Sequence, residues 1–107
     1  LNEENANFEK FDYLKDNFKN VGYSGHCKGI NDAIYAISNG ACCVEKHFTI
    51  DNNLEGRDNK FAITPIELKT LCKYSEDVKK FKINLGLDLQ ENENDVFKNY
   101  RGRWRNN

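Results

Sequence analysis

Several residue types are absent from this chain or rare in it. Its 107 residues include no methionine, one proline and one tryptophan, and the first of them is Leu1. Because a natural reading frame opens with methionine, we expect the sequence to be a piece of a longer protein. The length itself admits one small domain and no more.

A strong charge of one sign and long apolar runs are missing as well. Charged residues make up 31% of the chain, yet the formal net charge is −1, which gives no general attraction to nucleic acid or to a membrane surface. No run approaches the roughly 20 apolar residues that a membrane-spanning helix needs. We therefore expect neither a nucleic-acid partner nor a membrane partner.

The cysteines lack the paired CxxC spacing of a zinc site. They are Cys27, Cys42, Cys43 and Cys72. We expect free thiols in a reducing cytoplasm in preference to a disulfide framework. Cys42 and Cys43 lie in an apolar run, where a reduced thiol behaves as a small hydrophobic side chain.

The first half of the chain predicts a helix, a strand and a second helix. In the first helix, which is expected to end near Asn20, the apolar residues that recur at helical spacing are Phe8, Phe11, Leu14 and Phe18. Residues 21–24 form the predicted strand. The second helix opens at Gly29 and is stopped by Asn39 and Gly40. Its apolar stripe consists of Ile30, Ala33, Ile34 and Ile37.

The second half predicts another strand, a polar loop and a third helix. Residues 41–44 form a compact apolar run of the kind found in strands buried on both faces, and residues 51–61 form the loop. Thr64 is the predicted cap of the third helix, with a proline in the first helical position and Glu67 completing a capping box. This helix is expected to end near Gly86 and to direct inward Leu68, Leu71, Cys72, Val78 and Phe81.

Alternation of helices and strands at this spacing predicts parallel βα units, and therefore an α/β fold. Two strands alone make a poor sheet. Because both strands are apolar, we expect their missing neighbours to belong to a larger barrel or sheet. Residues 1–89 are assigned to this domain, and residues 90–107, which turn acidic and then basic and aromatic, to a linker or tail.

Two histidines follow the two predicted strands. Neighbouring parallel strands lie about 4.8 Å apart, so His26 and His47 could reach one divalent cation from the carboxyl ends of the strands. Water, a carboxylate or a substrate oxygen would complete the coordination of the metal. The alternative is that each is an ordinary core or loop histidine.

Three further side chains are candidates for a site at this edge. Ser24 shares a face with His26 and could bind a phosphate oxygen, or it could bond to nearby backbone. Glu45 could support a metal ligand or transfer a proton, or it could form an ion pair with Lys46 or with a neighbour from the missing part of the chain. Asp58 could accept hydrogen bonds from a polyol, or it could belong to a solvated turn.

The basic and aromatic residues 100–105 invite a separate hypothesis, namely that this end of the chain grips phosphates and stacks on bases. It is one short cluster on a nearly neutral chain, and no nucleic-acid motif accompanies it. We therefore favour the readings that rest on the strand ends.

Several ordered blocks of the sequence together resemble the sialic acid synthase family, which includes N-acetylneuraminate synthase and the legionaminic and pseudaminic acid synthases. The blocks are Gly22-Tyr-Ser-Gly-His26 followed by Gly29-Ile30, Asn39-Gly-Ala41, Val44-Glu-Lys-His-Phe-Thr-Ile50, Glu55-Gly-Arg-Asp58 and Thr64-Pro-Ile-Glu67-Leu-Lys69. The resemblance extends from about Phe8 to Gly86, and it is far more specific than any single motif.

This resemblance implies a fold. The family is a TIM (β/α)8 barrel followed by a small antifreeze-like domain. The chain would form a partial barrel, about the last two βα units with the helix that precedes them. The resemblance also implies a cytoplasmic enzyme and a homodimer, in which the antifreeze-like domain reaches across to close the sugar site.

The resemblance also implies a reaction. Phosphoenolpyruvate condenses with an N-acyl hexosamine such as N-acetylmannosamine, which gives a nine-carbon 2-keto acid and phosphate. The residues that match His26 and His47 hold a divalent metal, manganese or magnesium, that polarises the sugar aldehyde. By the same match, Ser24 contacts the phosphate of phosphoenolpyruvate, Asp58 binds sugar hydroxyls, and Glu45 is a candidate catalytic neighbour.

The sequence departs from the family pattern at three positions near the site. Gly25 stands where aspartate is frequent, which removes a carboxylate; Arg57 stands where proline is usual, and Asn59 where histidine is common. The last two positions lie in the loop that is expected to meet the sugar.

Most of the implied barrel lies outside these residues, and a quarter of a barrel cannot enclose a dry site. We therefore predict that the chain alone has no synthase activity. The alternative reading is a non-catalytic remnant of a barrel that serves as a binding or structural piece.

Overall fold

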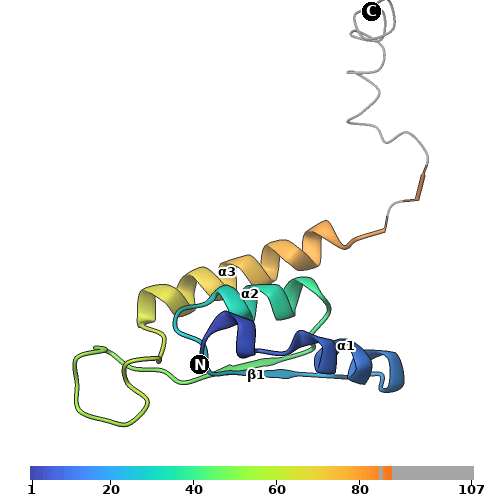
Figure 1. The fold of residues 1–107 in the computed structure, drawn as a ribbon. Helices are drawn as coiled ribbons and strands as arrows, with labels where there is room; N and C mark the ends of the chain where they lie inside the picture. The colour runs from blue at the N-terminus through green and yellow to red at the C-terminus, as the bar shows by residue number, and fades with distance from the viewer. Residues whose placement is uncertain (85, 88–107) are drawn as a thin grey trace, which may run out of the picture.

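The computed structural model describes residues 1–84, 86 and 87, so the predicted linker or tail at residues 90–107 lies outside the described residues. The elements in chain order are a 3-10 helix η1 (Glu3–Asn5), α1 (Phe8–Asn17), β1 (Tyr23–Gly25), α2 (Asn31–Ser38), β2 (Val44–Lys46) and α3 (Pro65–Phe81). This alternation is an α/β arrangement. Helices α2 and α3 lie on the same side of the strands (Figure 1).

The two strands pair in parallel. Tyr23, Ser24 and Gly25 stand opposite Val44, Glu45 and Lys46 in register. The chain after β2 then runs beside residue Ile63, which donates its backbone N–H to the His47 carbonyl at 2.7 Å and accepts from Thr49 N–H at 2.9 Å. The short parallel sheet is thus continued by one further bridge, between Phe48 and Ile63.

Both strands begin two or three residues later than the sequence predicts. Helix α2 ends at Ser38, and the next residues are used to turn the chain: Gly40 N–H bonds to Ile37 O at 3.1 Å, and Ala41 N–H bonds to Ala36 O at 3.0 Å. The apolar run at residues 41–43 therefore leads into β2 without being part of it. β1 begins at Tyr23, although the two segments are already joined just before the strands: Cys42 N–H donates to Val21 O at 2.9 Å, and Tyr23 N–H donates to Cys43 O at 3.0 Å.

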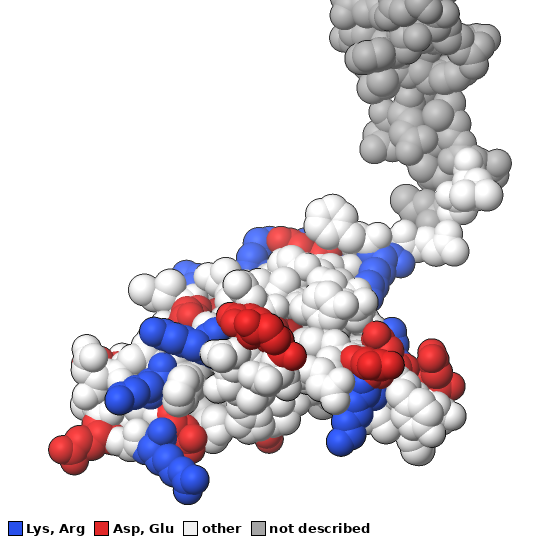
Figure 2. Space-filling model, in the orientation of Figure 1, with Lys and Arg blue, Asp and Glu red and all other residues white. Residues whose placement is uncertain are grey.

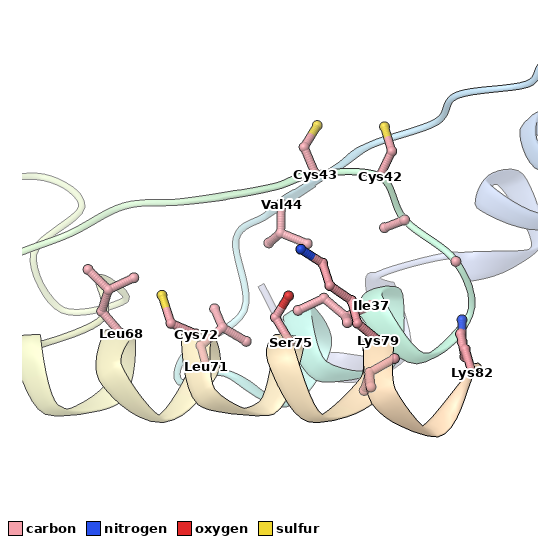
Figure 3. Close-up of a pocket in the computed structure, with 13 residues that line it drawn as sticks. Ile37, Cys42, Cys43, Val44, Leu68, Leu71, Cys72, Ser75, Lys79 and Lys82 are labelled. Carbon is pink, nitrogen blue, oxygen red and sulfur yellow. The ribbon is translucent and has the colours of Figure 1, made fainter.

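The prediction that the second strand is buried on both faces is wrong. Cys42 and Cys43 are exposed, and Figure 3 shows their thiols pointing away from α3, whereas Val44 points toward that helix. The described helices cover one face of the sheet, which leaves the other face open. Apolar composition was therefore a poor guide to burial at these two positions.

The core lies between α2, α3 and the covered face of the sheet. Ala33, Ile63 and Leu71 form its buried centre, with exposed fractions of 0%, 2% and 7%. The half-buried residues that pack around it are Ile30, Ile34, Ile37 and Val44. These include the apolar stripe that the sequence predicts for the second helix.

Helix α3 begins where the sequence predicts. The Thr64 N–H donates to Glu67 Oε1 at 3.1 Å, and the Thr64 hydroxyl donates to the same oxygen at 3.2 Å. The helix ends at Phe81, earlier than the predicted Gly86, and of the residues expected to point inward Leu71 is fully buried whereas Phe81 is 87% exposed. Leu68 and Cys72, which were also expected to point inward, are exposed, and Val78 is half-buried. All three border an open groove of about 380 Å³ between α3 and residues 40–44 (Figure 3).

Charge is mixed over the surface. Figure 2 shows acidic and basic side chains interspersed on the face that it draws. Within the described residues, no helix is both long enough and apolar enough to cross a membrane.

Helix α1 packs through Phe11, which is 6% exposed. Phe18 lies beyond the end of the helix and is 61% exposed, so the prediction that it belongs to the apolar stripe of this helix is wrong.

Candidate functional site

The two histidines stand side by side. β1 ends at Gly25 and β2 at Lys46, so His26 and His47 follow as the next pair in the parallel register. Their ring centres are 5.7 Å apart and their planes meet at 61°. Both residues are exposed. The structure thus brings together the two rings that the sequence places at the strand ends.

Ser24 and Glu45 lie on the same open face, directly opposite each other in register. The Ser24 hydroxyl donates to Glu45 Oε1 at 2.8 Å. The alternative pairing of Glu45 with Lys46 is wrong, because strand alternation sends Lys46 to the covered face. A small hollow of about 80 Å³ lies at this end of the sheet and is lined by Ser24, Gly25, Glu45, Lys46 and His47.

The spacing of the rings fits two ligands of one cation. With metal–nitrogen bonds of about 2.0–2.1 Å, two imidazoles on adjacent positions of a metal have ring centres about 4.5–5.5 Å apart. The observed 5.7 Å lies just beyond that range. Among the described residues, no group of three or more His, Cys, Asp or Glu side chains is placed to hold a metal. Any further ligands must therefore come from other groups.

Asp58 is not joined to these residues. It is exposed in the loop after β2, where its backbone carbonyl accepts from Phe61 N–H at 3.2 Å. Among the described residues, no hydrogen bond connects its side chain to Ser24 or Glu45. The structure therefore places Asp58 in the exposed loop between β2 and α3.

Two asparagines shape this loop. The Asn52 side-chain amide donates to the carbonyls of Asn59 at 2.7 Å and Ala62 at 2.9 Å. The Asn59 amide donates in turn to Leu54 O and Glu55 O, both at 2.9 Å. Asn59, one of the departures from the family pattern, is therefore a structural residue of the loop. The loop borders a hollow of about 560 Å³ whose lining includes Lys28 and Lys60.

A charged cluster under the histidines was missed by sequence reasoning. Lys46 Nζ donates to Asp32 Oδ1 at 2.9 Å and Oδ2 at 3.1 Å, and the two side chains are 3% and 2% exposed. The Tyr23 hydroxyl also donates to Asp32 Oδ2 at 2.9 Å. Burial, this hydrogen bond and the charge of Asp32 raise the pKa of Tyr23 above its ordinary value, so the phenol remains a donor.

The sequence did contain a signal for this cluster. Lys46 alternates with Val44 on the inward side of β2, and Asp32 lies beside the apolar stripe of α2, four residues before buried Ala36. Opposite charges on the inward sides of two adjacent elements indicate a buried ion pair, because an unpaired buried charge is costly.

All four cysteines are free thiols. Cys27 is 1% exposed, and burial, followed by the charge of Asp32, raises the pKa of its thiol. At Cys43, the hydrogen bond with Cys42 raises the pKa. The neutral thiol is thus favoured at both positions, which argues against a role for either as a nucleophile.

The comparisons with known proteins decide the family. The sequence profile of the NeuB family matches residues 1–85. This chain belongs to the NeuB family. The resemblance to the sialic acid synthases that the sequence shows is therefore confirmed, and the α/β arrangement agrees with it.

Curated relatives of this NeuB-family chain include synthases. It is 45% identical over 76 residues to the N,N'-diacetyllegionaminic acid synthase of Campylobacter jejuni, covering 70% of this chain and 23% of that protein. It is 34% identical over 92 residues to the pseudaminic acid synthase of the same species, covering 82% of this chain and 26% of that protein. The chain thus spans about a quarter of the length of these relatives.

A solved structure shows the same fold. The N-acetylneuraminic acid synthetase of Leptospira borgpetersenii superposes with a TM-score of 0.76 at 32% identity, over 98% of this chain and 37% of that one. The spore coat polysaccharide biosynthesis protein SpsE of Bacillus subtilis superposes with a TM-score of 0.68 at 31% identity, over 87% of this chain and 27% of that one.

Proposed function

We propose that this chain forms the last two βα units of a (β/α)8 barrel that makes a nonulosonic acid from phosphoenolpyruvate and an N-acyl hexosamine. The observation that carries the proposal is the meeting of His26 and His47 at 5.7 Å beside the bonded Ser24–Glu45 pair, at the carboxyl ends of two parallel strands of a NeuB-family chain. Active sites of such barrels lie at this end of the strands.

In this proposal the bond formed joins the methylene carbon of phosphoenolpyruvate to the aldehyde carbon of the open-chain sugar. A water molecule adds to the former enol carbon, and inorganic phosphate leaves with the oxygen that linked it to that carbon. Atoms balance without an oxidant or reductant. The product is a nine-carbon 2-keto acid when the acceptor resembles N-acetylmannosamine.

His26 and His47 would hold a divalent cation, Mn²⁺ or Mg²⁺, through neutral imidazole nitrogens. When bound, this metal supplies a Lewis acid for the sugar aldehyde. Ser24 now donates its proton to Glu45, and rotation of the hydroxyl would redirect it to a phosphate oxygen of phosphoenolpyruvate. Glu45 would then be free to accept a hydrogen bond or a proton from substrate. Asp58 would bind sugar hydroxyls from the loop.

The open face explains why activity should need more than these residues. The side chains of Ser24, His26, Glu45 and His47 are exposed, and fixed dipoles stabilise charge well only where water is excluded. We therefore propose that the chain alone does not turn over substrate. We further propose that the enzyme is a cytoplasmic homodimer; the free thiols are compatible with that compartment.

A graft tests the proposal directly. The matching segment of the Campylobacter jejuni legionaminic acid synthase, a relative that is 45% identical over 76 residues, is replaced by this chain. Phosphate release from phosphoenolpyruvate is measured with and without acceptor sugar and Mn²⁺. We expect sugar-dependent release by the graft and none by the chain alone.

Histidine variants of the graft supply the decisive comparison. His26→Ala and His47→Ala should each lower turnover at least a hundredfold, whereas Lys73→Met, which removes an exposed ion pair on α3, should leave it unchanged. Circular dichroism and gel filtration confirm that each variant is folded. Full activity in both histidine variants would overturn the metal assignment.

A further inference from the structure

We infer that Lys46 is a positioning residue, which fixes the separation of His26 and His47 from the covered face of the sheet. The inference concerns the placement of the two rings; it rests on the proposed function only in assigning that placement to a metal.

The contacts of Lys46 link the two histidine-bearing segments. Its ammonium donates to the carbonyl of Cys27 at 2.6 Å and to both carboxylate oxygens of Asp32. Cys27 directly follows His26, and Lys46 directly precedes His47. A single buried side chain therefore connects the backbone on one side of the histidine pair to the backbone on the other.

The bond between Lys46 and the Cys27 carbonyl lies beyond the last paired residues of β1 and β2. The register of β1 and β2 ends with Gly25 opposite Lys46. In the described part of the chain, no backbone hydrogen bond joins residues 26–30 to residues 47–50. The Lys46–Cys27 bond therefore joins the two segments just beyond the last paired residues of the strands.

Gly25 makes room for the lysine to cross. A Cβ atom at this position would clash with Asp32 Oδ2 and would lie 2.8 Å from both Lys46 Cδ and Tyr23 Cε2. The absence of a side chain lets the stem of Lys46 pass against β1. Tyr23 then holds Asp32 from the other side by its 2.9 Å hydrogen bond, which leaves the carboxylate little freedom.

Stability alone is a weak reason for such a cluster. A buried ion pair repays its desolvation cost only with good geometry, and apolar residues of similar size often serve as well. What an apolar pair could not do is hold the Cys27 carbonyl, which needs a donor. The specific consequence of Lys46 is therefore the position of the backbone next to His26.

The test uses the 107-residue chain labelled with ¹³C-histidine, because it contains two histidines and each labelled ring can be assigned. The nuclear Overhauser effect between the ring protons of His26 and His47 reports their proximity without metal or activity. The informative variant is Lys46→Met with Asp32→Asn, which removes both buried charges together and so avoids leaving one unpaired. A second variant, Lys46→Gln with Asp32→Asn, keeps a polar pair but has too short a side chain for the Cys27 carbonyl.

We expect the inter-ring effect to be strong in the native chain and to fall at least tenfold in both double variants. Tyr23→Phe removes a bond from the same cluster but leaves Lys46 and Cys27 joined, so it should keep the effect. Lys73→Met, which breaks an exposed ion pair, should keep it as well. Thermal unfolding of each variant shows whether the chain is still folded, and so distinguishes displacement of the two histidine rings from unfolding.

Three results would overturn the inference: no inter-ring effect in the native chain, native intensity in a folded double variant, or equal loss in Tyr23→Phe and the double variants. A parallel titration with Mn²⁺ keeps the proposed function separate. If the native chain shows the inter-ring effect and its dependence on Lys46 but no Mn²⁺ binding, the positioning role stands and the metal assignment for this chain fails.

Discussion

The two faces of the β1–β2 pair are built from alternate residues of the same two strands, yet their environments are opposite. On the covered face, Lys46 meets Asp32 with side chains that are 3% and 2% exposed, and Tyr23 donates to the same carboxylate. On the open face, Ser24 and Glu45 are exposed and bond to each other. The difference teaches that strand alternation separates residues that hold the fold from residues that are available for chemistry.

The largest effect on stability is expected from Lys46→Met alone. It leaves Asp32 buried without its partner, and the loss in free energy of unfolding should be about 3–5 kcal/mol. Urea unfolding of the chain, followed by circular dichroism, measures the change. Lys73→Met removes the other ion pair in the described residues, whose side chains are 65% and 39% exposed, and it should barely move the midpoint. Similar effects from both replacements would contradict the contrast between buried and exposed charge.

The next largest effect concerns the apolar support of the covered face. Ile63 is 2% exposed within the core, whereas Ile66, three residues later, is 80% exposed. Ile63→Ala should lower the free energy of unfolding by about 2–4 kcal/mol, because it removes buried methyl groups and leaves a cavity. Ile66→Ala should have little effect in the same urea experiment. Equal losses at the two positions would place the core elsewhere.

A smaller effect is expected at the cap of the helix that covers this face. Thr64→Ala removes the hydroxyl at the start of α3 and should cost about 1 kcal/mol. Thermal unfolding monitored at a helix wavelength measures the loss. Thr70→Ala, inside the same helix and exposed, is the matched control. The assignment of Thr64 as the cap would fail if the two variants melted alike.

The smallest effect on stability is expected on the open face of the β1–β2 pair. Replacing His26 and His47 together by alanine should change the free energy of unfolding by no more than about 0.5 kcal/mol, because both are exposed. The same double variant should lose any Mn²⁺ binding seen by electron paramagnetic resonance in the native chain. A large loss of stability would instead make the histidines structural residues.

Much of the local structure could be predicted from the sequence. Thr64 and Glu67 predict the start of α3, and the apolar stripe that includes Ala33 identifies the buried side of α2. These features depend on neighbours within one or two turns. The approximate strand positions, and the candidates His26 and His47, follow from the same local patterns.

Burial was predicted less well where it depends on distant elements. Cys42 and Cys43 belong to an apolar run and were expected inside, yet no described helix covers their face of the sheet. Local pattern places Asp32 and Lys46 on the inward sides of their elements, but it does not show that they meet; they pair because α2 packs on the strand that carries the lysine.

The sequence by itself therefore determined the order of the elements, the cap of α3, the alternation along each strand and the family. The tertiary structure decided which residues meet: Tyr23 opposite Val44, His26 beside His47, and Lys46 against both Asp32 and the Cys27 carbonyl. The physical reason is that parallel register is set by the packing of the connecting helix against the sheet. That packing joins residues far apart in the chain, so no local pattern encodes it.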